Sequence, residues 1–281
     1  MPFRWRPDGD YIANLPHTRR VMPFIMRSRN ESAVYYEQHL DVEKTWDFIE
    51  RASTEFGMKV TILHVLVWRA AQVLHLRPGL NRFVAGRRIY QRRGVWITFS
   101  IKKAMTTASP DLMVKLKVDP AWSLQEVVER VHKFINTSRS DTKSFTDTEM
   151  SILFKLPTMV VDFFASLLMR FDHLGLLPGF MLKEDEMYAS LAIANLGSIG
   201  LEPAYHHLYE YGNIPIFAAV GKKSPRMVVD EIGRPAVRDI MTIRYTFDER
   251  IHDGFYGIQA LELFKHLVEN PEEQVDLTAA Q

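Results

Sequence analysis

Acidic, basic and histidine side chains gather in one short segment near the C-terminal end, Asp248-Glu249-Arg250-Ile251-His252-Asp253-Gly254. A carboxylate such as Glu249 and an imidazole such as His252 are side chains that accept and release protons during catalysis. The two lie three residues apart, so an extended backbone places them on opposite faces of the chain. A turn at Asp253-Gly254 would change that geometry. This segment is therefore the first candidate for acid–base chemistry.

A pair of adjacent histidines, His206-His207, lies in a tyrosine-rich segment at 205–212. Neighbouring residues of a strand point to opposite faces, so the pair is a poor geometry for two ligands of one metal ion. The surrounding tyrosines favour a packed or interfacial surface. The chain contains no cysteine, which excludes disulfides, thiolate metal sites and a cysteine nucleophile. We expect no metal site.

The elements that must position these residues mix strands and helices. Runs of β-forming residues predict strands at 34–40, 88–91, 95–101, 113–118, 190–199, 214–221 and 241–247, and the turn at Arg93-Gly94 predicts a hairpin. Apolar spacing and capping residues predict helices at 41–56, 61–77, 123–135 and 255–268. The stretch 151–182 has a helical pattern interrupted by two prolines, and 137–148 is polar and predicts a loop.

The apolar pattern continues through every candidate boundary, so we expect one α/β domain spanning 1–281, with a basic arm at 1–30. Apolar residues make up 47% of the chain, which allows a sizeable core. The N-terminal 20 residues lack the apolar run of a secretory signal. Together with the missing cysteines, this indicates a cytoplasmic protein.

The net charge of the chain argues against nucleic acid as a partner. The net charge is +1, so no global field attracts nucleic acid, although 77–103 carries only basic charges. That run is either a local patch for phosphates or an acidic partner, or the solvated face of a hairpin. The most apolar stretch, 163–169, is far shorter than the ~20 residues of a membrane span, so membrane contact is not expected. Alternative roles for 151–182 are a lid, a surface for membrane or an acyl chain, or ordinary core or subunit interface.

Three C-terminal segments belong together: 193–200, with Ala194-Asn195-Leu196-Gly197; 215–221, ending in Gly221; and 248–254, followed by a helix ending in Asn270-Pro271-Glu272. Together they resemble the catalytic domain of the acyltransferase component of 2-oxoacid dehydrogenase complexes and its relative chloramphenicol acetyltransferase. The resemblance implies a mixed sheet flanked by helices, a homotrimer with active sites between subunits, and coenzyme A or an acyl-CoA as ligand. No lipoyl domain precedes these segments in the sequence, so we expect a bare catalytic-type domain.

Two positions depart from the family pattern. Glu249 stands where the family has a histidine that takes a proton from a thiol, and Ala194 stands where it has a Ser or Thr that steadies the oxyanion. A thiol titrates near ~8.5 and a glutamate near ~4.3, so this proton transfer is uphill by about 4 pKa units, roughly 6 kcal/mol. His252 as an alternative base and Asn195 as an alternative oxyanion donor complete the catalytic candidates.

The scaffold residues of the site are retained. Asp253 and Gly254 match the family's Asp-Gly, whose aspartate holds the loop through an arginine near the N-terminus, and Arg19 and Arg20 are the candidate partners. Two functions follow: a CoA-dependent acyltransferase-like enzyme with an altered active site, or a non-catalytic trimeric pseudoenzyme for assembly or regulation. Whether the chain is an enzyme is left open by the sequence. A membrane-associated binding protein is a third, weaker hypothesis.

Overall fold

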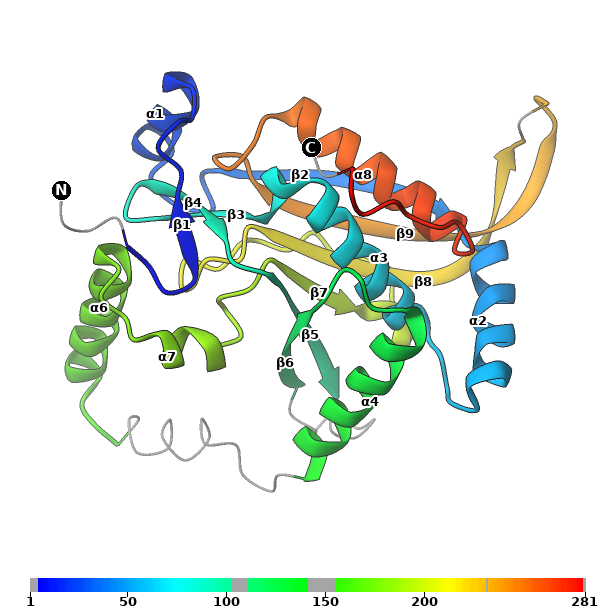
Figure 1. Ribbon diagram of the computed structural model, residues 1–281, viewed down its shortest axis with the longest axis horizontal. Coiled ribbons are helices and arrows are strands. Elements are labelled where there is room, and N and C mark those ends of the chain that lie inside the picture. The colour runs from blue at the N-terminus through cyan, green and yellow to red at the C-terminus, as the bar shows by residue number, and fades with distance from the viewer. Residues whose placement is uncertain (1–4, 103–110, 141–154, 231, 280–281) are drawn as a thin grey trace.

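A six-stranded mixed sheet forms the centre of the molecule, with strand order β2-β9-β8-β7-β5-β6 (Figure 1). The computed structural model describes residues 5–102, 111–140, 155–230 and 232–279. Strand β7 pairs in parallel with β5 and β8, whereas β2 with β9, β8 with β9 and β5 with β6 pair antiparallel. A small second sheet has the order β1-β4-β3. The predicted mixed sheet flanked by helices is confirmed.

The described residues form the following strands and helices, in chain order. The strands are β1 Gly9–Tyr11, β2 Ala33–Asp41, β3 Arg82–Ala85, β4 Arg88–Arg92, β5 Val95–Lys102, β6 Asp111–Val118, β7 Leu191–Asn195, β8 Ile216–Val229 and β9 Pro235–Asp248. The α-helices are α1 His17–Ile25, α2 Glu43–Phe56, α3 Ile62–Leu76, α4 Leu124–Ser140, α6 Thr158–Leu174, α7 Gly179–Glu184 and α8 Gly254–Glu269. Short 3₁₀ helices are η1 Pro78–Asn81 and η2 Leu196–Ile199.

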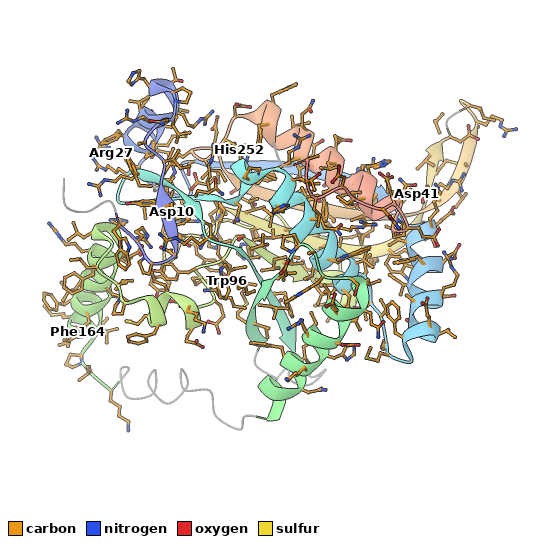
Figure 2. All side chains as sticks on the ribbon, viewed as in Figure 1. Asp10, Arg27, Asp41, Trp96, Phe164 and His252 are labelled. Carbon is orange, nitrogen blue, oxygen red and sulfur yellow. The ribbon has the colours of Figure 1, made fainter. Side chains whose placement is uncertain are left out.

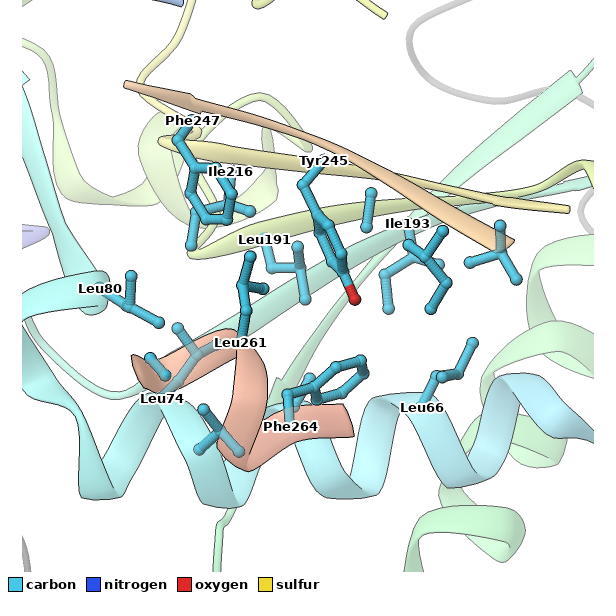
Figure 3. A pocket seen from close by; sticks show the side chains of 16 residues that line it. Leu66, Leu74, Leu80, Leu191, Ile193, Ile216, Tyr245, Phe247, Leu261 and Phe264 are labelled. Carbon is cyan, nitrogen blue, oxygen red and sulfur yellow. The ribbon is translucent and has the colours of Figure 1, made fainter. Parts of the chain in front are cut away.

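The main core lies between the sheet and the helices α3 and α8 (Figure 3). Leu66 and Leu74 of α3 and Phe264 of α8 face the apolar side chains of the central strands across a cavity of about 50 Å³. Tyr245 enters this core from β9 and donates its hydroxyl hydrogen to Gln38 at 3.3 Å. The cavity is too small for a substrate, and we interpret it as a packing defect of the core.

The predicted hairpin at Arg93-Gly94 is wrong. Both edges of β4 are occupied, because β4 pairs with β1 on one side and with β3 on the other, and β5 begins in the main sheet. Gly94, at φ 75°, turns the chain from one sheet into the other. The hairpin of this region instead joins β3 and β4 at Gly86-Arg87, both of which have positive φ.

Two further predictions need correction. Strand β7 ends at Asn195, where η2 begins, so 196–199 is not extended. Helix α4 continues to Ser140, so the predicted loop at 137–148 is helical at its start, and the remainder lies outside the described residues. The capping box is present as predicted, because the amide of Ser123 donates to Glu126 at 2.8 Å and the amide of Glu126 donates to the Ser123 hydroxyl at 3.3 Å.

The basic run 77–103 does not form one solvated face in its described part. Arg92 is 4% exposed and its guanidinium lies 4.4 Å from the centre of the Phe83 ring. Arg93 pairs with Asp10 of β1. These arginines therefore tie the small sheet together rather than present a common surface.

Helix α6 is apolar but largely exposed in this chain. Met159 is 85% exposed and Phe163 62%, and only Asp172 of the helix is buried. Figure 2 shows Phe164 on the outer side of the molecule, away from the sheet. Helix α6 is therefore not ordinary core of this chain, whereas Leu177 and Leu182 after it are buried. The alternative of a subunit interface stays a prediction, and residues 151–154 lie outside the described part. No helix of the described residues is long and apolar enough to cross a bilayer.

The capping box at the start of α3 contains a buried histidine, so we expect the free energy of unfolding of the protein to depend on pH. The amide of Thr61 donates to Nδ1 of buried His64 at 3.0 Å, and burial, followed by the charge of His132, lowers the pKa of His64 from 6.5 to about 4. The folded state therefore binds a proton at His64 more weakly than the unfolded state does. The stability that neutral His64 contributes is complete above pH 6.5 and is lost as the pH falls toward 4. This difference corresponds to about 3 kcal/mol.

The variant His64→Gln tests this expectation, because glutamine is the usual residue at this capping position and does not titrate. Urea unfolding at pH 7 and at pH 4.5 should show a smaller loss of unfolding free energy in the variant than in the parent protein. Equal losses in both proteins would show that His64 does not carry the effect.

Candidate active site

The loop 248–254 is anchored by a buried ion pair. Asp248 is 0% exposed and Arg250 4%, and two hydrogen bonds of 2.8 and 2.7 Å join the guanidinium to the carboxylate. Burial alone would raise the pKa of Asp248, but the hydrogen bonds and charge of Arg250 lower it below its usual value. Arg250 also donates to the carbonyl of Met26 at 3.3 Å. The pair links the end of β9 to the segment after α1.

Arg19 holds the same loop from the other side. Its Nη1 donates to the carbonyl oxygens of Glu249 and His252, at 2.8 and 2.9 Å. Among the described ion pairs, none joins Arg19 or Arg20 to Asp253, so the expected arginine–aspartate pair is replaced by contacts to the backbone. Arg20 is exposed on α1.

Asp253 is the N-cap of α8. Its Oδ1 accepts a hydrogen bond of 2.8 Å from the amide of Tyr256, which satisfies one of the free N–H groups at the start of the helix. Gly254 follows as the first helical residue, and a Cβ built on it would meet nothing within 4 Å. The space beside Gly254 is therefore open to a ligand or a partner.

Glu249 presents its side chain to solvent at the turn after β9. Its amide donates to the carbonyl of Ser32 at 2.9 Å, so the backbone is fixed while the side chain is exposed. The structure gives its carboxylate no ion pair or hydrogen bond with any described residue. The alternative in which an arginine of the same chain neutralises Glu249 is thus absent from the described part.

His252 is buried, not solvent-facing. It is 8% exposed, and its Nδ1 lies 2.8 Å from the carbonyl oxygen of Asp253, which makes Nδ1 the protonated nitrogen. Nε2 then carries the lone pair, and it has no hydrogen-bond partner among the described residues. Burial lowers the pKa of His252. A Cβ at Gly257 would come within 2.6 Å of the ring, so this glycine lets the imidazole pack against α8.

A cavity of about 220 Å³ opens beside this loop. Its lining includes Arg19, His252, Asp253 and Tyr256, so the fold brings several of the predicted site residues to one place. Arg82 and Tyr256 were not singled out by the sequence. Tyr256 accepts a hydrogen bond from the Gly79 amide at 3.0 Å, a contact that no local sequence pattern indicates.

Ala194 and Asn195 lie at the end of β7, level with the middle of the β2–β9 pairing and away from Glu249. Asn195 is level with Val220 of β8, which is level with Ile243 of β9. Asp248 follows Ile243 by five positions along β9, about 17 Å at the usual rise. One copy of the chain therefore does not bring Glu249 and Asn195 together.

The side chain of Asn195 has a local role of its own. Its Oδ1 caps η2 by accepting a hydrogen bond from the Ser198 amide at 3.2 Å. The glycine two residues later is required by packing, since a Cβ on Gly197 would lie 2.4 Å from the carbonyl oxygen of Gly221. The Asn-x-Gly segment and the glycine that ends the predicted strand at 214–221 therefore meet in space.

The adjacent histidines lie in an irregular segment, not in a strand. The rings of His206 and His207 stack with centres 4.8 Å apart, and His206 also stacks on Phe217 at 3.8 Å. The expectation of opposite faces is wrong, because this segment is not a strand and the two rings stack on one another. No group of three or more potential metal ligands occurs among the described residues.

Comparison with known proteins agrees with this architecture. Residues 181–275 match the family model of the 2-oxoacid dehydrogenases acyltransferase catalytic domain. A probable dihydrolipoamide acetyltransferase of Listeria monocytogenes superposes with a TM-score of 0.62 at 16% identity, covering 96% of this chain and 99% of that one. The chain therefore has the fold of these acyltransferase cores, and residues 181–275 carry the sequence similarity to the family. No curated protein gives a significant sequence match.

Two further structures share the fold of this chain. Dihydrolipoamide acetyltransferase of Azotobacter vinelandii has a TM-score of 0.61 at 16% identity, with 93% of each chain covered. Chloramphenicol acetyltransferase has a TM-score of 0.54 at 11% identity, covering 93% of this chain and 98% of that one. The likeness extends over nearly the whole chain, including the N-terminal half where the sequence motifs are weak.

Proposed function

We propose that this chain is a CoA-dependent acyltransferase-like domain whose active site forms between the subunits of a homotrimer. The observation that carries the proposal is the loop after β9, which is held by Arg19 and by the Asp248–Arg250 pair and presents the free carboxylate of Glu249. A rigid loop with one exposed, unpaired acid is a geometry suited to proton transfer.

The separation of Glu249 and Asn195 supports a site made by two copies. Asn195 lies about 17 Å along the strand direction from the loop that carries Glu249, so the two side chains cannot meet within one chain. In a closed ring of three subunits, the end of β7 in one copy can meet the loop after β9 in the next. The proposed trimer thus explains why both segments are retained although they lie far apart.

The spacing within the loop gives further support. In the Azotobacter vinelandii enzyme, a serine, a histidine and an asparagine four residues after the histidine have been investigated in the catalytic mechanism. Glu249 and Asp253 have the same spacing of four residues. We infer that Glu249 occupies the position of the base and that Asp253 supports the loop as the cap of α8.

The proposed step is an acyl transfer from a CoA thioester. Glu249 accepts the proton of the incoming nucleophile, which attacks the thioester carbon, and the proton returns to the departing CoA sulfur. Burial of the carboxylate between subunits would make it a stronger base and reduce the uphill cost of the transfer. Because Ala194 has no hydroxyl, the amide of Asn195 or a backbone N–H would stabilise the oxyanion.

Titration calorimetry with CoA and acetyl-CoA, carried out on the protein of residues 1–281, tests the proposal. We expect saturable binding below about 1 mM, which corresponds to roughly 4 kcal/mol of binding free energy. Size-exclusion chromatography with light scattering should give three times the mass of one chain. A monomer that binds neither ligand would refute the proposal.

A non-catalytic trimer is the second candidate function. The replacement of both chemical groups of the family site, through Glu249 and Ala194, favours it. This hypothesis predicts that Glu249→Ala preserves the cellular role, whereas substitutions that break subunit contacts abolish it. Loss of the cellular role in Glu249→Ala, with the trimer intact, would exclude it.

A further inference from the structure

The cavity of about 220 Å³ beside the Glu249 loop carries more positive than negative charge in its lining. Among the described residues that line it, Arg19 and Arg82 face the single carboxylate of Asp253. Burial lowers the pKa of His252, so the imidazole adds no charge near neutral pH. The walls come from the segment before α1, the first turn of α1, the start of β3 and the start of α8, and Figure 1 shows the start of α8 turned toward α1.

Arg82 is a half-buried arginine without an anionic partner in the described part of the chain. Its one hydrogen bond there is long, 3.4 Å from Nε to Oε1 of Gln91. Gln91 is itself fixed, because its amide nitrogen donates to the carbonyl oxygens of Pro78 and Asn81 at 3.0 and 2.9 Å. The terminal nitrogens of Arg82 are neither hydrogen-bonded to a described residue nor fully buried. They can therefore reach a ligand in the cavity.

The electrostatic surroundings of Arg82 contain a second cation and no anion. Burial lowers the pKa of Arg82, the phenol of Tyr256 opposes this, and the positive charge of Arg19 lowers the pKa further. Arg19 and Tyr256 therefore lie close enough to Arg82 to act on its charge. No carboxylate of the described residues contributes to this balance. Two like charges that face one cavity without a counter-ion favour an anion between them.

Arg19 keeps free donors in the same cavity. Its Nη1 donates to the carbonyl oxygens of Glu249 and His252 at 2.8 and 2.9 Å. Nε and Nη2 have no acceptor among the described residues and are not fully buried. Because the Glu249 carbonyl oxygen contacts Nη1, a ligand on the other edge of this guanidinium lies beside the loop that presents Glu249.

The acidic group of the lining does not pair with these arginines. Among the described ion pairs, none joins Asp253 to Arg19 or Arg82, and Oδ1 of Asp253 accepts the amide hydrogen of Tyr256 at 2.8 Å. The hydroxyl oxygen of Tyr256 accepts a hydrogen bond from the amide of Gly79 at 3.0 Å, and no described residue accepts the hydroxyl hydrogen. The lining therefore offers two guanidinium groups and one hydroxyl as donors.

Arg244 shows how a partly exposed arginine is satisfied elsewhere in the fold. Its guanidinium pairs with Glu37, donates to the carbonyl oxygen of Pro203 at 2.7 Å and lies 4.3 Å from the centre of the Tyr205 ring. Arg82 has no partner of these three kinds in the described part of the chain. A guanidinium with unused donors matches the two oxygens of a carboxylate or phosphate.

Apolar residues of the cavity indicate what else the ligand carries. Leu15 and Pro16 line the same space as the two arginines. They suit the carbon chain of a short carboxylic acid, whereas inorganic phosphate would leave this apolar surface without a partner. The cavity volume of about 220 Å³ also exceeds what a single water molecule requires.

We propose that this cavity binds the carboxylate of a short substrate between Arg19 and Arg82. The proposal rests on the proposed function for the role of the ligand as a substrate, whereas the binding itself does not require acyl transfer. It names the substrate class, an acyl group or acceptor that ends in a carboxylate. A ligand held there brings its other end toward the loop that presents Glu249.

Titration calorimetry with butyrate, acetate and inorganic phosphate, at constant ionic strength and without CoA, tests the proposal on the protein of residues 1–281. We expect butyrate to saturate the site below about 10 mM. Two further methylene groups against Leu15 and Pro16 should make butyrate bind up to about tenfold more tightly than acetate. No saturation by butyrate, or tighter binding of phosphate than of both acids, would overturn the proposal.

The variant Arg82→Gln removes the charge and the donor fork from one wall. Butyrate binding should weaken at least about tenfold, as for the loss of a hydrogen bond to a charged group. The midpoint of urea unfolding should not fall, because Arg82 makes only the one long hydrogen bond with described residues. The matched control Arg170→Gln removes a positive charge from exposed α6, outside the cavity, and should bind butyrate like the parent protein. Equal affinity in Arg82→Gln and the parent protein contradicts the proposal.

Thermal unfolding of the parent protein keeps the test decisive if Arg82→Gln does not fold. Saturating butyrate should raise the unfolding midpoint above that in sodium chloride of equal ionic strength, because the ligand binds only the folded state. An unchanged midpoint would count against the site. Binding of butyrate without binding of CoA would support this site and refute the proposed function. Binding of CoA without binding of butyrate would leave the proposed function standing and overturn this inference.

Discussion

Replacing Glu249 by glutamine should lower acyl-transfer turnover by about 10²–10⁴-fold, the usual contribution of a positioned general base. Glutamine keeps the size and polarity of the side chain but cannot accept the proton. Within one chain the carboxylate is exposed and makes no described contact, so the substitution removes no interaction that holds the fold of that chain, and the protein should remain folded. Turnover of acetyl-CoA with a thiol acceptor, measured beside urea unfolding, gives both quantities.

A matched control comes from Glu272→Gln, which removes an exposed carboxylate whose only described ion pair is with Arg51. It should leave turnover unchanged. His252→Asn separates the two candidate bases, because it removes the unpartnered Nε2 and leaves Glu249 intact. If His252→Asn abolishes turnover while Glu249→Gln lowers it less than about tenfold, the base is His252 and the assignment of Glu249 fails.

Replacing Arg250 by methionine should cost about 3–5 kcal/mol of unfolding free energy, because it leaves a buried charge without its partner. Asp248 is 0% exposed, and Arg250 supplies the hydrogen bonds and charge that lower its pKa. In the variant this carboxylate has to be protonated or the loop has to open. Urea unfolding at pH 7 measures the loss.

Two comparisons isolate the buried pair. The double variant with Asp248→Leu and Arg250→Met should regain much of the stability, because no buried charge is then left alone. Arg51→Met breaks the exposed pair with Glu272 and should cost less than about 1 kcal/mol. A cost for Arg250→Met no greater than that for Arg51→Met would show that Asp248 finds another partner.

The arrangement of the loop bears on both functional hypotheses. A trimer that has lost catalysis would still need Arg19, Asp248 and Arg250 to shape its interface, whereas it would not need a free acid at Glu249. The two single substitutions therefore test different properties. Arg250→Met probes the scaffold, and Glu249→Gln probes the chemistry.

Much of the local structure follows from the sequence alone. Helices α2, α3 and α8 and strands β2 and β6 lie where apolar periodicity and capping residues predict them, because these signals act within a few residues. The loop motif at 248–254 likewise predicts the acyltransferase fold, and the family match and the structural neighbours confirm this fold.

Only the tertiary structure decided which distant residues meet. The register of β7, β8 and β9 places Asn195 far from Glu249, and the pairing of β4 with β1 and β3 replaces the predicted hairpin. The burial of Arg29 against the carbonyl groups of Gly212 and Ile214 also could not be predicted from the sequence, because these residues lie far along the chain. Local patterns determine the elements, whereas pairing register and the path of the connections determine the sites between them.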